Sequence, residues 1–328
     1  MNIRTRLAAG SVTAIVLITG GVAAIRHANT QGKPERSDSG YPPPGRMVDV
    51  GGFKLHLHCT GHGTPTVVLE AGNGTMSADW AWVQPEIAKT TRVCAYDRAG
   101  VAWSEPSPQP RDALHIAQEL HTLLAEGGVR GPVVLVGHSF GGLYVREYAA
   151  LFPAEVAGLV LVDATHPDQW IRPAGGKEQL DMMLAMAQQP VAPTPEPPPA
   201  NPDLPPRAGA QIRALTNSTT HLGAATAEFL ATVATNDEVR RTRRTLGALP
   251  LLVVTATEHG FPPELRPQLE GTHAELQREL AGLSSRSVQR IIAGADHTGL
   301  LENETLSRST TGAVVDVVDA VRTGRGPT

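Results

Sequence analysis

The chain alternates short unbroken apolar runs with longer segments whose apolar residues recur at helical spacing. Apolar runs of this length are typical of strands buried on both faces of a parallel sheet. We expect these strands at Thr66–Glu70, Thr91–Tyr96, Val133–Val136, Val156–Val162, Leu249–Thr255 and Ser287–Ile292. We expect the helices at Trp80–Lys89, Ala113–Leu124, the segment ending at Leu151, Glu264–Leu283 and Thr305–Val321. This alternation predicts an α/β fold with a mostly parallel central sheet and helices on both faces.

Two segments depart from the alternation. Met47–Val50 and Phe53–Cys59 predict a hairpin that turns at Gly51-Gly52. Residues 168–246 hold Met-rich and Ala-rich helical pieces and a proline run from Pro190 to Pro206. We interpret this second segment as a helical cap inserted over the carboxyl edge of the sheet, where such folds place their sites.

The N-terminus has a different composition from the rest of the chain. Arg4 and Arg6 precede the uncharged apolar stretch Leu7–Ile25, which ends near the small residues Val22-Ala23-Ala24. Residues 1–27 are therefore either a cleaved signal peptide or a membrane anchor, with the signal slightly favoured. Residues 28–45 are predicted to be a flexible linker and residues 46–328 the α/β domain. Both interpretations predict export, with the domain outside the cytoplasm.

The net charge bears on the kind of binding partner, and the cysteines bear on a possible disulfide. The net charge of the 328 residues is −4, so no basic footprint for nucleic acid is present. Cys59 and Cys94 are the two cysteines. An exported chain would allow a disulfide between them, and buried free thiols are the alternative.

One short segment has the pattern of a catalytic nucleophile. The apolar run before it ends in Gly137-His138-Ser139-Phe140-Gly141, and a helical pattern follows. A serine between glycines at minus two and plus two, between strand and helix, is the G-x-S-x-G nucleophile elbow. The turn is so sharp that a Cβ at Gly137 or Gly141 would strike a neighbouring element, and it lifts Ser139 above the sheet.

A serine nucleophile needs a histidine base and a carboxylate that orients the base. His297 follows the last strand in a Gly/Ala/Asp turn and is the favoured base, with His259 the second choice; His138 is expected to pack or donate locally. Asp163 closes one strand and Glu258 the next, and the chain order Ser, acid, His allows either. Asp163 is favoured because it ends a rigid element, and Glu258 stays the alternative.

The reaction intermediate also needs amide donors. The backbone N–H of Phe140, which follows Ser139, and that of Asn73, in Gly72-Asn73-Gly74, are the candidates for an oxyanion hole. Neither a metal nor an organic cofactor is implied. The methionine-rich part of the insertion is expected either to line an apolar substrate pocket or to pack against the sheet; it contains Met182, Met183, Leu184 and Met186.

The elbow GHSFGG, the strand-end Asp163, the run AYDRAGVAWS and the late GADH together resemble the α/β-hydrolase superfamily over about Met47 to Val321. The family's usual His-Gly before the oxyanion residue is Ala71-Gly72 here, and no aspartate occupies its commonest acid position. Some members carry the acid one strand earlier, where Asp163 stands. Dehalogenases and epoxide hydrolases of this superfamily use an aspartate nucleophile, so Ser139 argues against both activities.

The resemblance implies a serine hydrolase that cleaves a carboxylic ester or related acyl bond of a small molecule through an acyl-enzyme, and the N-terminal segment adds the expectation that it is exported. Alternative activities on the same triad are a carbon–carbon hydrolase, a lactonase and a cofactor-free peroxidase. A non-catalytic ligand-binding protein on a hydrolase scaffold is the third interpretation.

Overall fold

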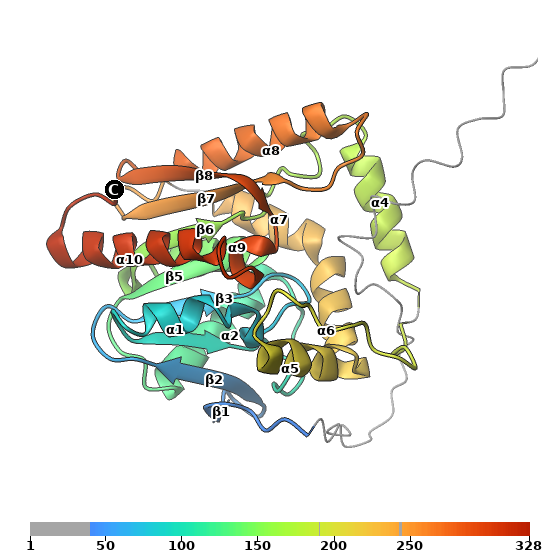
Figure 1. The fold of residues 1–328 in the computed structure, drawn as a ribbon, viewed down its shortest axis with the longest axis horizontal. Coiled ribbons are helices and arrows are strands. Elements are labelled where there is room, and N and C mark those ends of the chain that lie inside the picture. Colours follow the sequence, from blue (N-terminus) through green and yellow to red (C-terminus); the bar gives the residue numbers. More distant parts are fainter. Residues whose placement is uncertain (1–39, 190, 243–244) are drawn as a thin grey trace, which may run out of the picture.

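A computed structural model describes residues 40–189, 191–242 and 245–328 (Figure 1). Its centre is an eight-stranded sheet. The strands are β1 (Arg46–Asp49), β2 (Lys54–Thr60), β3 (Val67–Glu70), β4 (Val93–Tyr96), β5 (Val133–His138), β6 (Val156–Val162), β7 (Leu251–Glu258) and β8 (Ser287–Asp296). Their order in the sheet is β1-β2-β4-β3-β5-β6-β7-β8.

The sheet is parallel from β4 to β8 and antiparallel at one edge. β1 and β2 form the hairpin expected across Gly51-Gly52, and β2 pairs antiparallel with β4. The other pairs are parallel. The carboxyl ends of the parallel strands therefore meet at one edge of the sheet, and the predicted fold class is confirmed.

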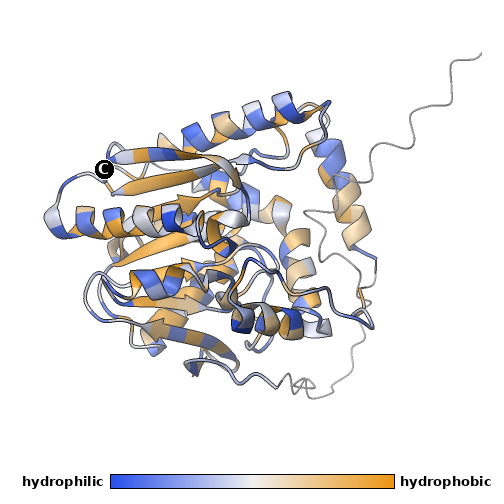
Figure 2. Ribbon diagram, viewed as in Figure 1, coloured by the Kyte–Doolittle hydropathy of each residue, from blue (hydrophilic) through white to orange (hydrophobic). Residues whose placement is uncertain are grey.

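Helices cover both faces of this sheet. The helical elements before the cap are η1 (Ser77–Trp80), α1 (Val83–Ile87), α2 (Ala113–Glu126), α3 (Gly141–Leu151) and η2 (Pro153–Glu155). Those after it are α8 (Arg266–Ala281), α9 (Gly299–Glu302) and α10 (Ser307–Thr323). α2, α3 and α8 pack against one face, and α1, α9 and α10 against the other. Along β5, Leu135 faces the first group while Val134 and Val136 face the second, which explains the unbroken apolar run (Figure 2).

The described residues between β6 and β7 form four helices, α4 (Gly176–Ala187), α5 (Pro206–Thr216), α6 (Thr219–Leu230) and α7 (Thr232–Arg241). Residues 191–205 of the proline run contain no helix or strand, and α5 begins at Pro206. α6 lies against the loops that follow β3 and β4, since Ala225 and Ala224 approach Gly74 and Gly100. The insertion thus covers the carboxyl edge of the sheet.

Two expected elements differ from the structure. The helix expected over Trp80–Lys89 is instead the short η1 followed by the five-residue α1. The Gly/Ala/Asp turn expected before His297 is also wrong, because β8 continues through Gly294 to Asp296. A glycine with φ of 74° at position 294 lets the strand bend without ending it.

Cys59 and Cys94 stand opposite each other on β2 and β4 and form a disulfide, which settles the choice left open by the sequence. The last residues of the expected linker contact the domain, because Trp103 Nε1 donates to the Tyr41 carbonyl. Within the described ranges, helices of sufficient length and apolarity for a membrane crossing are absent. The expected signal or anchor at residues 1–27, and linker residues 28–39, lie outside the described residues.

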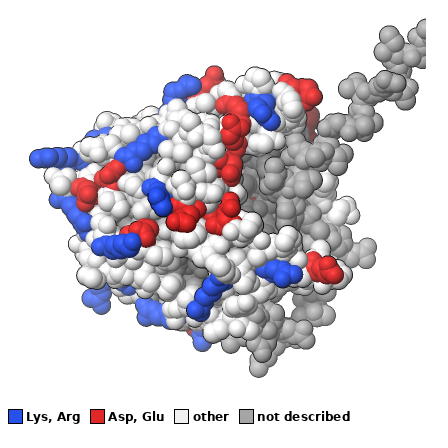
Figure 3. Space-filling view, in the orientation of Figure 1, with Lys and Arg blue, Asp and Glu red and all other residues white. Residues whose placement is uncertain are grey.

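The surface in the view of Figure 3 carries lysine and arginine side chains interspersed with aspartate and glutamate. Mixed signs of this kind are ordinary for a soluble surface. The absence of nucleic-acid binding stays a prediction.

Candidate active site

Ser139 occupies a strained turn between β5 and α3. Its φ is 54°, in the left-handed region that non-glycine residues rarely adopt. A Cβ on Gly137 would lie 2.6 Å from the carbonyl oxygen of Gly141, and one on Gly141 would lie 2.5 Å from that of Glu70. The turn is held by the Ser139 carbonyl, which accepts from the N–H groups of Gly142 and Thr165 at 3.0 and 2.9 Å. Tight backbone packing therefore explains both the glycines and the half-buried position of Ser139.

Asp163 directly follows β6 at the same edge of the sheet. It is 2% exposed, has a φ of 41°, and its Oδ2 accepts from His297 Nδ1 at 2.7 Å. Because His297 Nδ1 carries the proton of this hydrogen bond, Nε2 is the ring nitrogen whose lone pair can accept a proton. Glu258, the alternative acid, ends β7 with an exposed side chain. The structure thus pairs His297 with Asp163.

Asp163 accepts three further hydrogen bonds. The Ala256 N–H donates to Oδ1 at 3.0 Å, His273 Nε2 donates to Oδ1 at 2.9 Å, and His259 Nε2 donates to Oδ2 at 3.0 Å. Burial alone would raise the pKa of Asp163, but the hydrogen bonds from His259, His273 and His297 outweigh it and hold the pKa well below its usual range. The carboxylate is therefore ionised at neutral pH.

His259, the second choice for the base, has both ring nitrogens engaged. Its Nδ1 lies 2.7 Å from Glu270 Oε2, in addition to the bond from its Nε2 to Asp163. Burial opposes protonation, but the Asp163 and Glu270 carboxylates raise the pKa of His259 to about 9. A ring with neither nitrogen available is a poor general base.

His138 is buried and packs against His297, in line with the expectation of packing, but its hydrogen bond goes to a distant residue instead of a local one. Its ring centroid is 4.5 Å from that of His297, and its Nε2 donates to the His297 carbonyl at 3.0 Å. Burial, together with the charge of nearby His297, lowers the pKa of His138 to about 3, so the ring is neutral. This bond ties the backbone of His297 to the residue that precedes Ser139.

The two oxyanion candidates flank Ser139. A Cβ on Gly72 would lie 3.0 Å from the Cβ of Ser139, so the Gly72-Asn73 loop abuts the serine. In the described part of the chain, the backbone N–H groups of Asn73 and Phe140 take no part in turn, loop or cap hydrogen bonds. The Asn73 side chain is occupied elsewhere, since its Nδ2 donates to the Ala225 carbonyl at 2.8 Å. The backbone amides are thus the groups available for an oxyanion.

A buried ion network holds this loop to the cap. Arg98, from the loop after β4, bonds Glu70 Oε1 at 2.6 Å and Glu228 Oε1 of α6 at 2.7 Å. Its guanidinium also donates to the carbonyls of Ala71 and Gly72, each at 2.7 Å. All three ionic side chains are at most 2% exposed. The role of Arg98 was missed from the sequence, although the resemblance of AYDRAGVAWS to a family loop marked its position.

The methionines of α4 differ in burial, and the two exposed ones fill neither of the expected roles. Met183 is buried in an apolar cluster with Phe140 and Trp170, while Met182 and Met186 are 48% and 50% exposed. Met183 therefore belongs to the apolar cluster around Phe140, the residue that follows Ser139. Met182 and Met186 face outward.

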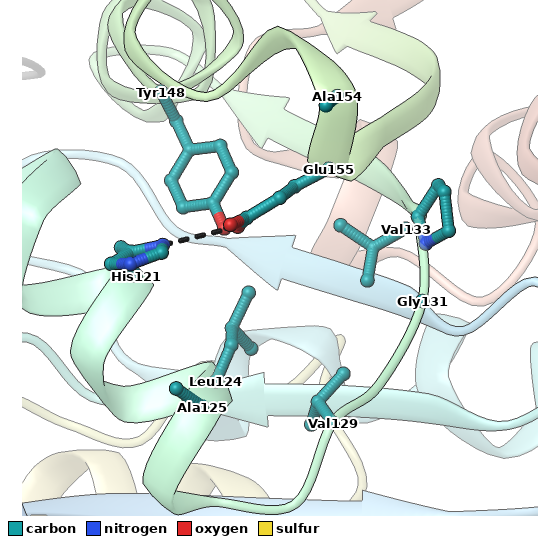
Figure 4. Close-up of a pocket in the computed structure, with 10 residues that line it drawn as sticks. His121, Leu124, Ala125, Val129, Gly131, Val133, Tyr148, Ala154 and Glu155 are labelled. Carbon is teal, nitrogen blue, oxygen red and sulfur yellow. Dashed lines mark hydrogen bonds and ion pairs between the residues drawn. The ribbon is translucent and has the colours of Figure 1, made fainter.

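A pocket elsewhere on the molecule does not belong to this site. Figure 4 shows it between the end of α2, the end of α3 and the segment entering β5, where Tyr148 Oη and His121 Nδ1 both bond Glu155. Residues 131–133 enter β5 at the end opposite to Ser139. The pocket thus lies at the far edge of the sheet from Ser139, Asp163 and His297.

Asp79 and Glu302 form a carboxyl pair near the site. Burial and the neighbouring Glu302 raise the pKa of Asp79 well above its usual range, and burial raises that of Glu302. The two side chains hydrogen-bond each other, which favours the form of the pair that shares one proton over the doubly ionised form. The Asn201 Nδ2 donates to Glu302 at 2.5 Å and anchors the proline run to the same pair.

Substitution of Asp79 by asparagine is expected to stabilise the protein at pH 8 by about 1–3 kcal/mol and to have little effect at pH 4. A carboxyl group whose folded pKa is raised stabilises the fold below its unfolded pKa, and this contribution is lost as pH rises through the folded pKa. Asparagine keeps the acceptor for the Met76 N–H and stays neutral. Urea unfolding at both pH values measures the difference. Asp181→Asn, on an exposed ion pair, is the control, and equal effects of Asp79→Asn at the two pH values would contradict the shared proton.

Comparison with known proteins identifies the family. A family model described as alpha/beta hydrolase fold matches residues 65–304. The 2-hydroxy-6-oxo-2,4-heptadienoate hydrolase of Pseudomonas putida is 37% identical over 131 residues, which are 37% of this chain and 44% of that protein. The chain spans less than half the length of the curated relatives that it matches, from 20% to 47%.

Solved structures agree on the fold. An esterase of Thermogutta terrifontis superposes with a TM-score of 0.62 at 21% identity, covering 84% of this chain and 98% of that one. A serine hydrolase involved in carbazole degradation gives a TM-score of 0.60 at 19% identity, covering 84% and 98%. At these identities the likeness concerns the fold alone. With its sheet order, its strand-to-helix turn at Ser139 and the family match over residues 65–304, the chain belongs to the alpha/beta hydrolase fold family.

Proposed function

We propose that this protein is a serine hydrolase that cleaves a carboxylic ester or a related acyl bond of a small molecule. The observation that carries the proposal is the 2.7 Å bond from His297 Nδ1 to the buried Asp163, at the sheet edge where Ser139 sits on its strained turn. Such a bond leaves His297 Nε2 free to accept a proton from the serine.

The reaction proceeds through an acyl-enzyme. Ser139 Oγ attacks the acyl carbon while His297 Nε2 takes its proton, and Asp163 stabilises the imidazolium that forms. The backbone N–H groups of Phe140 and Asn73 stabilise the oxyanion. His297 then returns the proton to the departing alcohol, and a water molecule, deprotonated by His297, releases the acid and restores Ser139.

A fluorophosphonate probe, followed by hydrolysis of p-nitrophenyl esters of graded chain length, tests the proposal. We expect the probe to label Ser139, and Ser139→Ala to abolish labelling and lower ester turnover by about 10⁴-fold or more. Ser285→Ala, an exposed serine next to β8, is the matched control. Folded wild-type protein that neither labels nor turns over an ester would instead favour the non-catalytic binding protein.

A carbon–carbon hydrolase is the second candidate. It is favoured by the 37% identity with a relative named as a 2-hydroxy-6-oxo-2,4-heptadienoate hydrolase. Turnover of a 2-hydroxy-6-oxo-dienoate with a kcat/KM above that for every ester in the series would replace the esterase assignment.

We also propose that the protein is exported through residues 7–25. The disulfide between Cys59 and Cys94 supports this, since such bonds persist in oxidising compartments. Cell fractionation and the mass of the mature protein test it: a cleaved signal removes about the first 24 residues, an anchor keeps them in the membrane fraction, and a full-length cytosolic protein would contradict export.

A further inference from the structure

Two histidines converge on Asp163 in addition to the one that the proposed reaction needs. His259 follows β7 and His273 lies on α8, so separate elements bring them to the carboxylate. Their Nε2 atoms lie 3.0 Å from Oδ2 and 2.9 Å from Oδ1 of Asp163. One ligand atom from each of the three residues lies within 4.8 Å of the others. A triad carboxylate requires one histidine partner, so the other two need a separate explanation.

These atoms form a donor set suited to a divalent transition-metal ion. Two imidazole nitrogens and one carboxylate oxygen are the ligands that zinc takes at open sites, with bonds of about 2.0–2.2 Å. Ligand atoms around one tetrahedral ion are then about 3.4 Å apart. The two nitrogens lie 2.9 and 3.0 Å from different oxygens of Asp163, and one ligand atom from each of the three residues lies within 4.8 Å of the others, so a small movement of the side chains brings three donors to one ion.

The surroundings of His259 are those of a metal ligand. Its Nδ1 donates to Glu270 Oε2 at 2.7 Å, and its backbone N–H donates to Glu270 Oε1 at 3.0 Å. A carboxylate on the far nitrogen fixes the ring and directs Nε2 toward the ion. The side chains of Asp163, His259 and His273 are 0%, 9% and 12% exposed, so little water competes for them.

We propose that Asp163, His259 and His273 bind a divalent transition-metal ion of the zinc type, and that this ion inhibits hydrolysis by competing with His297 for Asp163. The ion takes the charge of the carboxylate that orients His297, which leaves the base without its acceptor. Only the inhibition rests on the proposed function, and binding itself does not.

Calorimetric titration of tag-free, chelator-treated protein with zinc chloride tests the site. We expect one ion per chain, and at least a tenfold weaker affinity for His259→Gln and for His273→Gln. Loss of the outer carboxylate in Glu270→Gln is expected to weaken binding by about tenfold. His121→Gln, on an exposed pair at the opposite edge of the sheet, is expected to leave the affinity unchanged. Cobalt(II) absorption of a tetrahedral site, lost in His273→Gln, identifies the ligands.

Zinc binding is measured in Ser139→Ala as well as in the wild type. The binding result therefore does not depend on whether the protein hydrolyses esters. In active wild-type protein, zinc is expected to inhibit with a constant equal to its dissociation constant, and chelator to restore activity. Absence of stoichiometric binding, or binding that the two histidine substitutions leave unchanged, overturns the site. Stoichiometric binding without inhibition overturns the competition.

Discussion

Replacing Asp163 by asparagine is expected to lower kcat for ester hydrolysis by about 10⁴-fold. Asparagine has nearly the same shape, but it carries no charge and one of its two terminal groups donates instead of accepting. His297 Nδ1 bonds Oδ2, so the loss of this acceptor removes both the correct tautomer and the stabilisation of the imidazolium. Steady-state kinetics with the best p-nitrophenyl ester measures the effect.

The matched comparison is Glu258→Gln, which changes the other strand-end acid. Because Glu258 is exposed and His297 bonds Asp163, we expect kcat to stay within about twofold of the wild type. Circular dichroism establishes that both variants are folded. Full activity in Asp163→Asn together with an inactive Glu258→Gln would transfer the acid role to Glu258.

Replacing Arg98 by methionine is expected to destabilise the fold by about 3–5 kcal/mol. The change leaves the carboxylates of Glu70 and Glu228 buried without their cation. It also removes the donor to the carbonyls of Ala71 and Gly72, next to the proposed oxyanion residue Asn73. We therefore expect a lower kcat as well, because the loop that abuts Ser139 keeps only the Asn73 side chain as its link to the cap helix α6 among the contacts described above.

Urea unfolding followed by circular dichroism measures this stability change. Arg172→Met is the control, since the Arg172 side chain is 37% exposed in its pair with Glu279 and such pairs contribute about 0–1 kcal/mol. A loss below about 1 kcal/mol for Arg98→Met would mean that the network contributes no more than a surface pair.

Local patterns were sufficient for the fold class and for Ser139. A strand buried on both faces needs an unbroken apolar run, as in β5, and the turn at Ser139 needs glycine at 137 and 141 because the backbone packs within 2.6 Å of any added Cβ. Both requirements leave their mark within one short segment, so the sequence shows them even though the groups that impose them, such as the Glu70 carbonyl beside Gly141, lie far away in the chain.

The composition of the candidate site around Asp163 depends on distant segments. Asp163 directly follows one strand and Glu258 ends the next, and only the fold turns His297 toward Asp163. His138 reaches the His297 carbonyl across 159 positions. Arg98 and Glu228 are likewise 130 positions apart. Periodicity carries no information about such pairs.

The sequence by itself thus determined the α/β architecture, the position of the cap between two strands and the serine on its glycine-flanked turn. The tertiary structure alone decided which carboxylate meets His297, which histidines surround that carboxylate and which arginine joins the serine's loop to the cap. The physical reason is that burial and backbone sterics act on each residue where it stands. Charge pairing, in contrast, depends on the strand order and register that bring remote side chains to one edge of the sheet.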